Sequence, residues 1–215
     1  MRTACFIILC SLLGSAGCNI VAPAFVLIHG PPKTAAAYKL DPKRPTVFFV
    51  DDRNNRLYRR SMRLTIAATA QTILLEQKVL QNVIDAQAAL TRVAGEPADE
   101  PTDLVSLGKS VQAEVVVWIG VDSFGFSPDG VTFQPFADLR VKVVDCVNTP
   151  SRLWPEEPPG KPIRVLLPEK HGTNDQASPS ALAKAQDQLA QECGRTVAEL
   201  FFDHETSRHA YEKNQ

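Results

Sequence analysis

Two adjacent carboxylates, Asp51 and Asp52, follow directly after the apolar run Thr46–Val50 and are the pair best suited to chemistry. Acidic pairs at the carboxyl end of a strand can bind a divalent cation, because hard cations prefer carboxylate oxygens. No later strand pattern supplies the third acid and the lysine that such a site needs. The side chain of an aspartate after a strand can also accept hydrogen bonds from unpaired backbone N–H groups in a turn, and we expect that structural role here.

The histidines offer a second set of polar groups. His204 and His209 are five residues apart, which takes them off a common helical face, so a solvated helix end is the expected state. His29 and His171 lie in loop-like sequence with no obvious Ser or Cys partner. No phosphate-binding loop, nucleophile elbow or HExxH motif occurs. We therefore predict no enzyme activity, no cofactor and no metal site.

A cluster of arginines follows the Asp51–Asp52 pair and could contact lipid head groups or an acidic partner. The alternative is that these arginines only face solvent in a loop and at the start of a helix. Trp118 lies within a strand pattern and is expected in the core, whereas Trp154 stands beside Pro155 and is expected to be exposed. Arg63 belongs to the cluster but is left out of the predicted contact surface. That surface comprises Arg53, Arg56, Arg59, Arg60 and Trp154.

The N-terminus has the pattern of an export signal. Arg2 is the only charge before the apolar run 4–13, and small residues lead to Cys18. The segment Ser15-Ala16-Gly17-Cys18 resembles a bacterial lipobox, in which the cysteine is lipidated and becomes the first residue of the mature chain. Ser15 departs from that pattern, which usually has Leu, Val or Ile at this place.

An uncleaved anchor is the main alternative, because residues 4–28 are long and apolar enough to span a bilayer. Plain secretion is a third possibility. We favour a signal peptide over residues 1–17, with lipid on Cys18 and a tether over residues 18–44. The remaining chain is then a single domain over 45–206 and a disordered tail over 207–215.

Length and composition exclude several classes. A chain of 215 residues suggests one domain, and 44% hydrophobic with 22% charged residues excludes wholesale disorder and a multi-span membrane protein. A balance of 23 basic against 24 acidic residues argues against a nucleic-acid binder.

The cysteines leave one question open. After Cys5, Cys10 and Cys18, only Cys146 and Cys193 remain for the folded part of the chain. They are expected either to form one disulfide or to be two buried free thiols.

Hydrophobic periodicity predicts an α+β domain: a mixed β-sheet with an antiparallel hairpin, packed by about three helices in the order β-α-β-α-β-β-(β)-α. The hairpin is indicated by the turn 128–130, which separates two alternating runs. Expected strands are 46–50, 82–85, 114–121, 131–147 and, less clearly, 163–167. Expected helices start at Ser61, Thr102 and Pro179 and end near Leu80, Val111 and Asp203.

The segment Leu107–Phe124 resembles a Leu-Gly…Ala-Asp-Val-Val-Ile-Gly-x-Val-x-x-Phe pattern. The pattern occurs in small envelope lipoproteins related to the curli-secretion lipoprotein, the lipoprotein activators of penicillin-binding proteins and the N-terminal domain of TolB. Val141–Asp145 with Leu153-Trp154 matches the last strand of that layout, which covers about 45–202. The proline-rich stretch 155–168 and the double aspartate depart from it.

The chain also resembles uncharacterised lipoproteins from Planctomycetes, through Tyr38–Leu40, Val50–Arg53 and Phe202–Glu205. Together the resemblances imply a bacterial envelope lipoprotein, anchored through Cys18 and facing the periplasm. We expect a non-enzymatic accessory or adapter for secretion, transport or wall synthesis, with an envelope protein or a second copy as partner and no nucleic acid. The alternatives are an auxiliary lipoprotein of an ABC-type transporter and a periplasmic metal-binding hydrolase using Asp51, Asp52 and a histidine.

Overall fold

The computed structural model describes residues 33–97, 100, 102–168 and 178–205, which form two units. In one unit, whose described residues are 33–35 and 203–205, strand β1 (Lys33–Thr34) pairs antiparallel with β8 (His204–Glu205). The other unit is Ala36–Phe202 and contains every other element. Cys18, the predicted signal peptide and the tail 207–215 lie outside the described residues.

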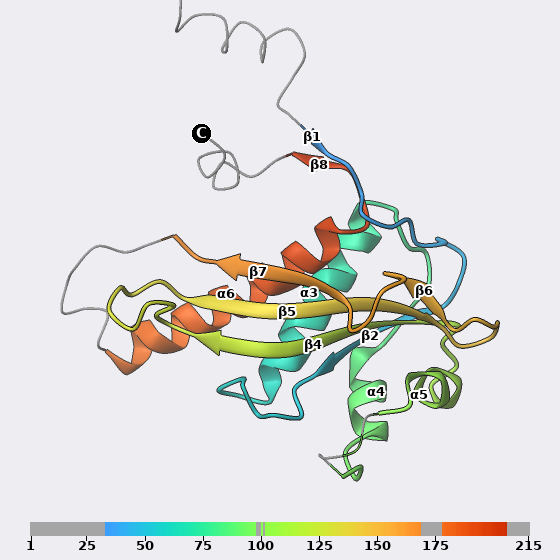
Figure 1. The fold of residues 1–215 in the computed structure, drawn as a ribbon, viewed down its shortest axis with the longest axis horizontal. Coiled ribbons are helices and arrows are strands. Elements are labelled where there is room, and N and C mark those ends of the chain that lie inside the picture. The colour runs from blue at the N-terminus through green and yellow to red at the C-terminus, as the bar shows by residue number, and fades with distance from the viewer. Residues whose placement is uncertain (1–32, 98–99, 101, 169–177, 206–215) are drawn as a thin grey trace, which may run out of the picture. The chain divides into compact units, whose positions relative to one another are not determined.

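The larger unit is built on a mixed sheet (Figure 1). Strand β2 (Thr46–Asp51) runs parallel to both of its neighbours, whereas β4 (Val115–Gly125) and β5 (Phe136–Asp145) form an antiparallel hairpin. Two short strands, β6 (Arg152–Trp154) and β7 (Lys161–Leu166), pair with different parts of β5. The α+β class, the mixed sheet and the hairpin are therefore confirmed. In spatial order the strands are β3 (Val83–Ile84), β2, β4, β5 and β6, with β7 beside β5.

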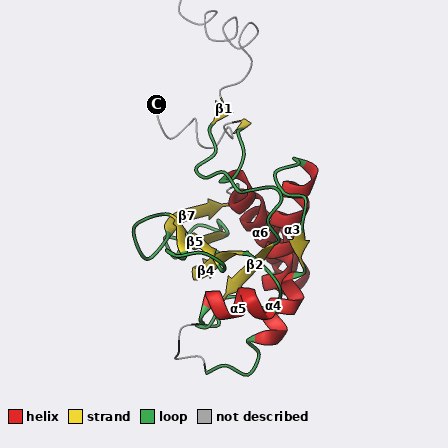
Figure 2. Ribbon diagram, turned by 90° about the vertical axis from the view of Figure 1, so that its right-hand side faces the viewer, coloured by secondary structure: helices red, strands yellow, loops and turns green. Residues whose placement is uncertain are grey.

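Four helices of the described residues cover the sheet as two pairs (Figure 2). The long helices α3 (Ser61–Glu76) and α6 (Pro179–Glu199) pack on one face. The short helices α4 (Ala86–Arg92) and α5 (Leu104–Ser110) pack on part of the opposite face. The sequence predicted about three helices and missed α4, which is too short to show a helical period but is capped by Asp85 through the backbone N–H of Gln87.

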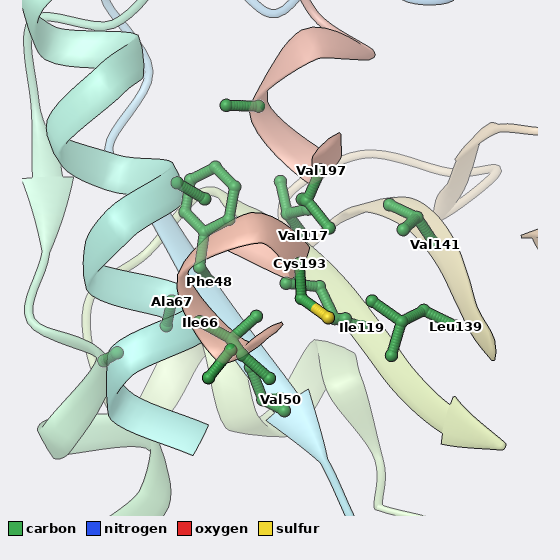
Figure 3. Close-up of a cluster of buried hydrophobic side chains, with 14 of the residues drawn as sticks. Phe48, Val50, Ile66, Ala67, Val117, Ile119, Leu139, Val141, Cys193 and Val197 are labelled. Carbon is green, nitrogen blue, oxygen red and sulfur yellow. The ribbon is translucent and has the colours of Figure 1, made fainter. Parts of the chain in front are cut away.

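The main core lies between the sheet and the α3/α6 pair (Figure 3). Alternate strand residues such as Phe48, Val117 and Val141 point toward Ile66 and Val197, and all five are fully buried. Burying apolar surface lowers the free energy of the folded state by about 25 cal/mol for each Å² removed from water. Burial of these side chains therefore stabilises the packing of α3 and α6 on the sheet.

A smaller core lies under α4 and α5 and includes Phe49, Val116 and Cys146. Cys193 belongs instead to the main core, and both cysteines are buried free thiols, which settles the question that the sequence left open. Burial raises the pKa of Cys146 to about 11 and also raises the pKa of Cys193. Both thiols therefore act as small apolar side chains.

The segment before β2 packs on the larger unit. Leu40 is buried in the main core, and Tyr38 lies against it. Arg44 donates two hydrogen bonds to the carboxylate of Asp145, at 2.8 and 2.9 Å, and one to Glu114 at 3.0 Å. The residues from Ala36 onward thus belong to the compact unit, although the sequence pattern assigned 36–44 to the tether.

Candidate functional site

The side chain of Asp51 is held at the end of β2 by two donors of the same chain. Its carboxylate pairs with the Arg53 guanidinium, with 2.6 Å between Nη2 and Oδ2. The Trp118 indole N–H donates to the same oxygen at 3.0 Å. Asp51 is almost completely buried. A buried carboxylate of this kind is stabilised by its partners and serves as an anchor for Arg53 and Trp118.

Asp52 shapes the turn that follows β2. Its two oxygens accept the backbone N–H groups of Arg56 at 2.7 Å and of Leu57 at 3.1 Å. This is the turn role that the sequence favoured. Across the described residues, no group of three or more His, Cys, Asp or Glu side chains is placed to hold a metal ion.

The arginines of the predicted contact surface do not act as one group. Arg53 turns inward to Asp51 and also donates to the carbonyl of Glu100. Arg59 pairs with Asp187 of α6 across the surface. Arg56 and Arg60 are exposed and have no carboxylate partner among the described residues. The part of the cluster left for an external partner is therefore smaller than the sequence suggested.

Arg63, which the predicted surface left out, has a structural role. Its Nε donates to the carbonyl of Val50 at 2.8 Å, and its guanidinium lies 5.8 Å from the centre of the Phe49 ring. Burial lowers its pKa, while Asp51 and Asp52 counteract that effect. Arg63 thus supplies a hydrogen-bond donor to a carbonyl group of β2 at a point where β3 no longer pairs with this strand.

Two hollows of similar size border these elements. A hollow of about 570 Å³ lies beside the turn after β2 and is lined in part by Asp51, Arg60, Arg63 and Thr91. The other, of about 640 Å³, is lined from α3 and α6 by Thr65 and Gln188, with Phe133 and Leu167. Many charged side chains of both signs line the first hollow, whereas the second is mainly apolar and has Glu192 and Arg195 as its charged residues.

The two tryptophans lie on opposite faces of the sheet. Trp154 is half-buried on the α3/α6 side, with its ring centre 6.1 Å from that of Tyr38 and 6.3 Å from that of Phe201. It is therefore less exposed than its position beside Pro155 suggested, and its role as a partner contact stays a prediction. Trp118, expected in the core, is half-buried on the opposite face, where its ring covers Gly120.

A charged region around Trp118 was missed by sequence reasoning. Cross-strand pairing places Trp118 opposite Lys142 and Gly120 opposite Arg140, all on the face that carries α4 and α5. The Lys142 ammonium lies 4.3 Å from the centre of the Trp118 ring. The alternation of charged Asp138, Arg140 and Lys142 along β5 was the available signal, because alternate residues share one face of a strand.

The remaining predicted residues divide between described and undescribed parts of the chain. His204 lies in β8, whereas His29, His171 and His209 are outside the described residues, as is Cys18. In the part of the chain that the structure describes, no helix is both long and apolar enough to cross a membrane. The predicted lipidation of Cys18 therefore stays a prediction.

No protein-family model and no curated protein matches the chain. Among solved structures, the hypothetical protein CT253 from Chlamydia trachomatis is similar over 73% of this chain and 97% of its own, with a TM-score of 0.41 and 16% identity. Lipoprotein GNA1162 from Neisseria meningitidis covers 69% of this chain and 95% of its own, with a TM-score of 0.39 and 14% identity.

A dodecamer of PelC from Paraburkholderia phytofirmans is similar over 79% of this chain and 94% of its own, with a TM-score of 0.37 and 12% identity. With TM-scores below 0.5, these matches do not indicate an activity or a partner for this chain. The resemblance of the sequence to envelope lipoproteins, including those from Planctomycetes, therefore stays a prediction.

Proposed function

We propose that this chain is a bacterial envelope lipoprotein, anchored through Cys18, that serves as a non-enzymatic accessory or adapter for an envelope assembly. The supporting sequence feature is the export signal ending in Ser15-Ala16-Gly17-Cys18. It is followed by the apolar residues 20–28 and then by residues 30–35, which are rich in small residues and proline and lead into the compact unit that begins at Ala36. That order suits a domain held near a membrane by a lipid and a short tether.

The observation that carries the non-enzymatic role is the state of Asp51 and Asp52. The Asp51 carboxylate is engaged by Arg53 and Trp118, and the Asp52 carboxylate by two backbone N–H groups. A general base or a metal ligand needs oxygens that are free to reach a substrate or an ion. The acidic pair with the best claim to chemistry is used instead to fix the turn and the Trp118 ring.

Membrane fractionation of the wild type and of Cys18→Ala tests the anchored part of the proposal. We expect the wild-type chain to stay with the membrane through a high-salt and carbonate wash, because acyl chains and not charges hold it. The variant should be released while its fold is retained. A wild-type chain that resists the wash but carries no acyl mass on Cys18 contradicts anchoring through Cys18.

Cross-linking in native membranes tests the adapter part. We expect the wild-type chain to form a defined covalent adduct with another envelope protein or with a second copy. The Arg56→Gln/Arg60→Gln variant should weaken the adduct if these exposed arginines contact the partner. A matched control is Arg92→Gln/Lys109→Gln, which removes the same charge from the ends of α4 and α5. A chain that stays a monomer under all these conditions contradicts an adapter role.

A further inference from the structure

We propose that the half of the sheet that α4 and α5 leave uncovered binds carboxylates of an acidic segment in a partner protein, through Lys142 and Arg152 beside the Trp118 ring. We name this region the open sheet face and define it by Trp118, Asp122, Arg140, Lys142 and Arg152. The inference deepens the proposed adapter function and rests on it, because it assigns the surface and the chemistry of the partner.

The register of the sheet creates the open sheet face. Val116 of β4 and Val144 of β5 point to α4 and α5, as does Phe49 of β2. Trp118, two positions after Val116, and Lys142, two positions before Val144, share that face but are only half-buried. Trp118 and Lys142 lie directly opposite each other on neighbouring strands. Arg152 of β6 pairs with Val144, which lies on the same face as Lys142, so the Arg152 side chain lies on that face as well.

Most charges on this side of the sheet are already paired. The Arg140 guanidinium donates to Asp122, at 2.7 Å between Nε and Oδ2, and Arg53 is paired with Asp51. Arg164 lies 3.5 Å from Asp138. These pairs leave no net charge of their own, so the charge balance of the open sheet face is set by Lys142 and Arg152.

Lys142 and Arg152 have no carboxylate partner among the described residues. The Lys142 ammonium rests on the Trp118 ring and makes no hydrogen bond to a described residue. Arg152 reaches only the carbonyl of Pro155, at 3.4 Å from Nη1. Both side chains are half-buried, so their charges are less well hydrated than those of freely exposed side chains. Two adjacent cations in this state favour an anion.

The charges around Lys142 point the same way. Its pKa is lowered first by burial and then by Arg152, with smaller contributions from Arg53 and Arg140 that Asp51 partly offsets. Repulsion among like charges is relieved when a carboxylate approaches them, and the pKa of the lysine then rises again. The arrangement is therefore complementary to an incoming carboxylate.

The composition of the open sheet face favours a protein over a membrane surface. The open sheet face has two cations without a carboxylate partner among the described residues, Lys142 and Arg152, whereas surfaces that bind anionic lipids usually carry about four to eight. One or two carboxylates of a peptide, in contrast, are enough to pair with Lys142 and Arg152. The half-exposed Trp118 ring offers apolar area beside them, and Trp and Arg are enriched where proteins contact each other.

Binding of a fluorescently labelled octaglutamate peptide to the full-length chain in neutral detergent tests this proposal. We expect saturable binding that changes Trp118 fluorescence in a Trp154→Phe background. Lys142→Gln/Arg152→Gln should weaken binding about tenfold or more, since it removes two charge-assisted hydrogen bonds. The control Lys184→Gln/Arg195→Gln removes the same charge from α6 and should change the affinity less than about twofold.

Several results would overturn the proposal. Equal weakening in the test and control variants means that only net charge matters. Equal occupation of the face by inorganic phosphate or by phosphatidylglycerol vesicles, lost in Lys142→Gln/Arg152→Gln, assigns it to phosphates instead. Lys142→Arg/Arg152→Lys keeps both charges and should retain binding, so loss of binding in this folded variant is also a contradiction.

Failure of this proposal is distinguishable from failure of the proposed function. If the peptide does not bind but Cys18→Ala is released from membranes, the anchored lipoprotein stands and the assignment of the open sheet face is wrong. If the wild-type chain purified from membranes carries no acyl mass on Cys18, anchoring through Cys18 is wrong whatever the peptide does.

Discussion

Arg44 and Asp145 are 101 residues apart in the chain and form a two-bond ion pair at the edge of the domain. Arg44 precedes β2, and Asp145 is the last residue of β5, with only 4% of its side chain exposed. The same guanidinium also reaches Glu114, next to β4. One side chain therefore fixes the start of β2 and of β4 against the end of β5.

We predict that Asp145→Asn lowers the free energy of unfolding by about 3 kcal/mol at neutral pH, because it removes one partner of a largely buried pair. Urea unfolding measures the effect. Asp187→Asn breaks the exposed Arg59–Asp187 pair and should cost less than about 1 kcal/mol. Equal losses in the two variants would show that the burial of Asp145 has no bearing on its contribution.

The same pair predicts a dependence on pH. The Arg44 guanidinium holds the pKa of Asp145 well below its ordinary value. The resulting stability is fully present above the ordinary carboxyl pKa of about 4 and is lost as the pH falls through the lowered value. Below about pH 4, unfolding free energies should fall more steeply for the wild type than for Asp145→Asn. Parallel curves would contradict this prediction.

Gly194 sets how closely α6 approaches α3. A Cβ at this position would lie 2.6 Å from the carbonyl oxygen of Ile66 and 2.6 Å from Cβ of Thr69. We predict that Gly194→Ala destabilises the domain by about 1–3 kcal/mol, because the backbone of α3 must move. Thermal unfolding measures it. The control is Gly95→Ala, where nothing lies within 4 Å of the new methyl group. If the control loses as much stability, close packing at Gly194 is not the cause.

Cys146 and Cys193 should resist thiol reagents in the folded protein. Both are buried, and burial raises the pKa of each thiol, so little thiolate forms near pH 8. Mass mapping after treatment with iodoacetamide should find both unmodified in native protein and both modified in guanidinium chloride. Rapid labelling of the native protein, or a Cys146–Cys193 disulfide in non-reduced digests, would contradict the buried free thiols.

Asp51 and Asp52 should contribute to stability and not to ion binding. We predict that Asp52→Ala costs about 1–2 kcal/mol, because two backbone N–H groups lose their acceptor. Calorimetric titration with Mg²⁺ or Mn²⁺ should give no stoichiometric binding to the wild type. A bound ion that disappears in Asp51→Asn/Asp52→Asn would contradict the structural role and support a metal-dependent hydrolase.

The class of the fold was predictable from the sequence because β2, β4 and β5 are long apolar or alternating runs and because a turn signal separates the last two. Helix α3 ends at Glu76, although apolar residues continue to Leu80, since Lys78 adopts a positive φ of 58° that a helix does not allow. Short elements such as α4 and β6 contain too few residues for a helical or strand periodicity of apolar residues to be recognised.

The directions of single side chains were less predictable, because they depend on neighbours distant in sequence. Five arginines within a few residues read as one basic patch, yet Arg53 and Arg63 turn inward and Arg59 crosses to α6. A strand position alone indicates a core residue at Trp118, but Trp118 packs at the margin of the smaller core and is only half-buried. The open sheet face could be found only once the register of β4 and β5 was known.

The intact mass of the chain purified from membranes tests anchoring through Cys18 most directly. We predict a mature chain that begins at Cys18 and carries added acyl mass, together with a Cys18→Ala variant that has neither the added mass nor stable membrane retention. A chain that keeps Met1 and stays in the membrane without Cys18 would contradict the lipoprotein and make residues 4–28 an uncleaved anchor.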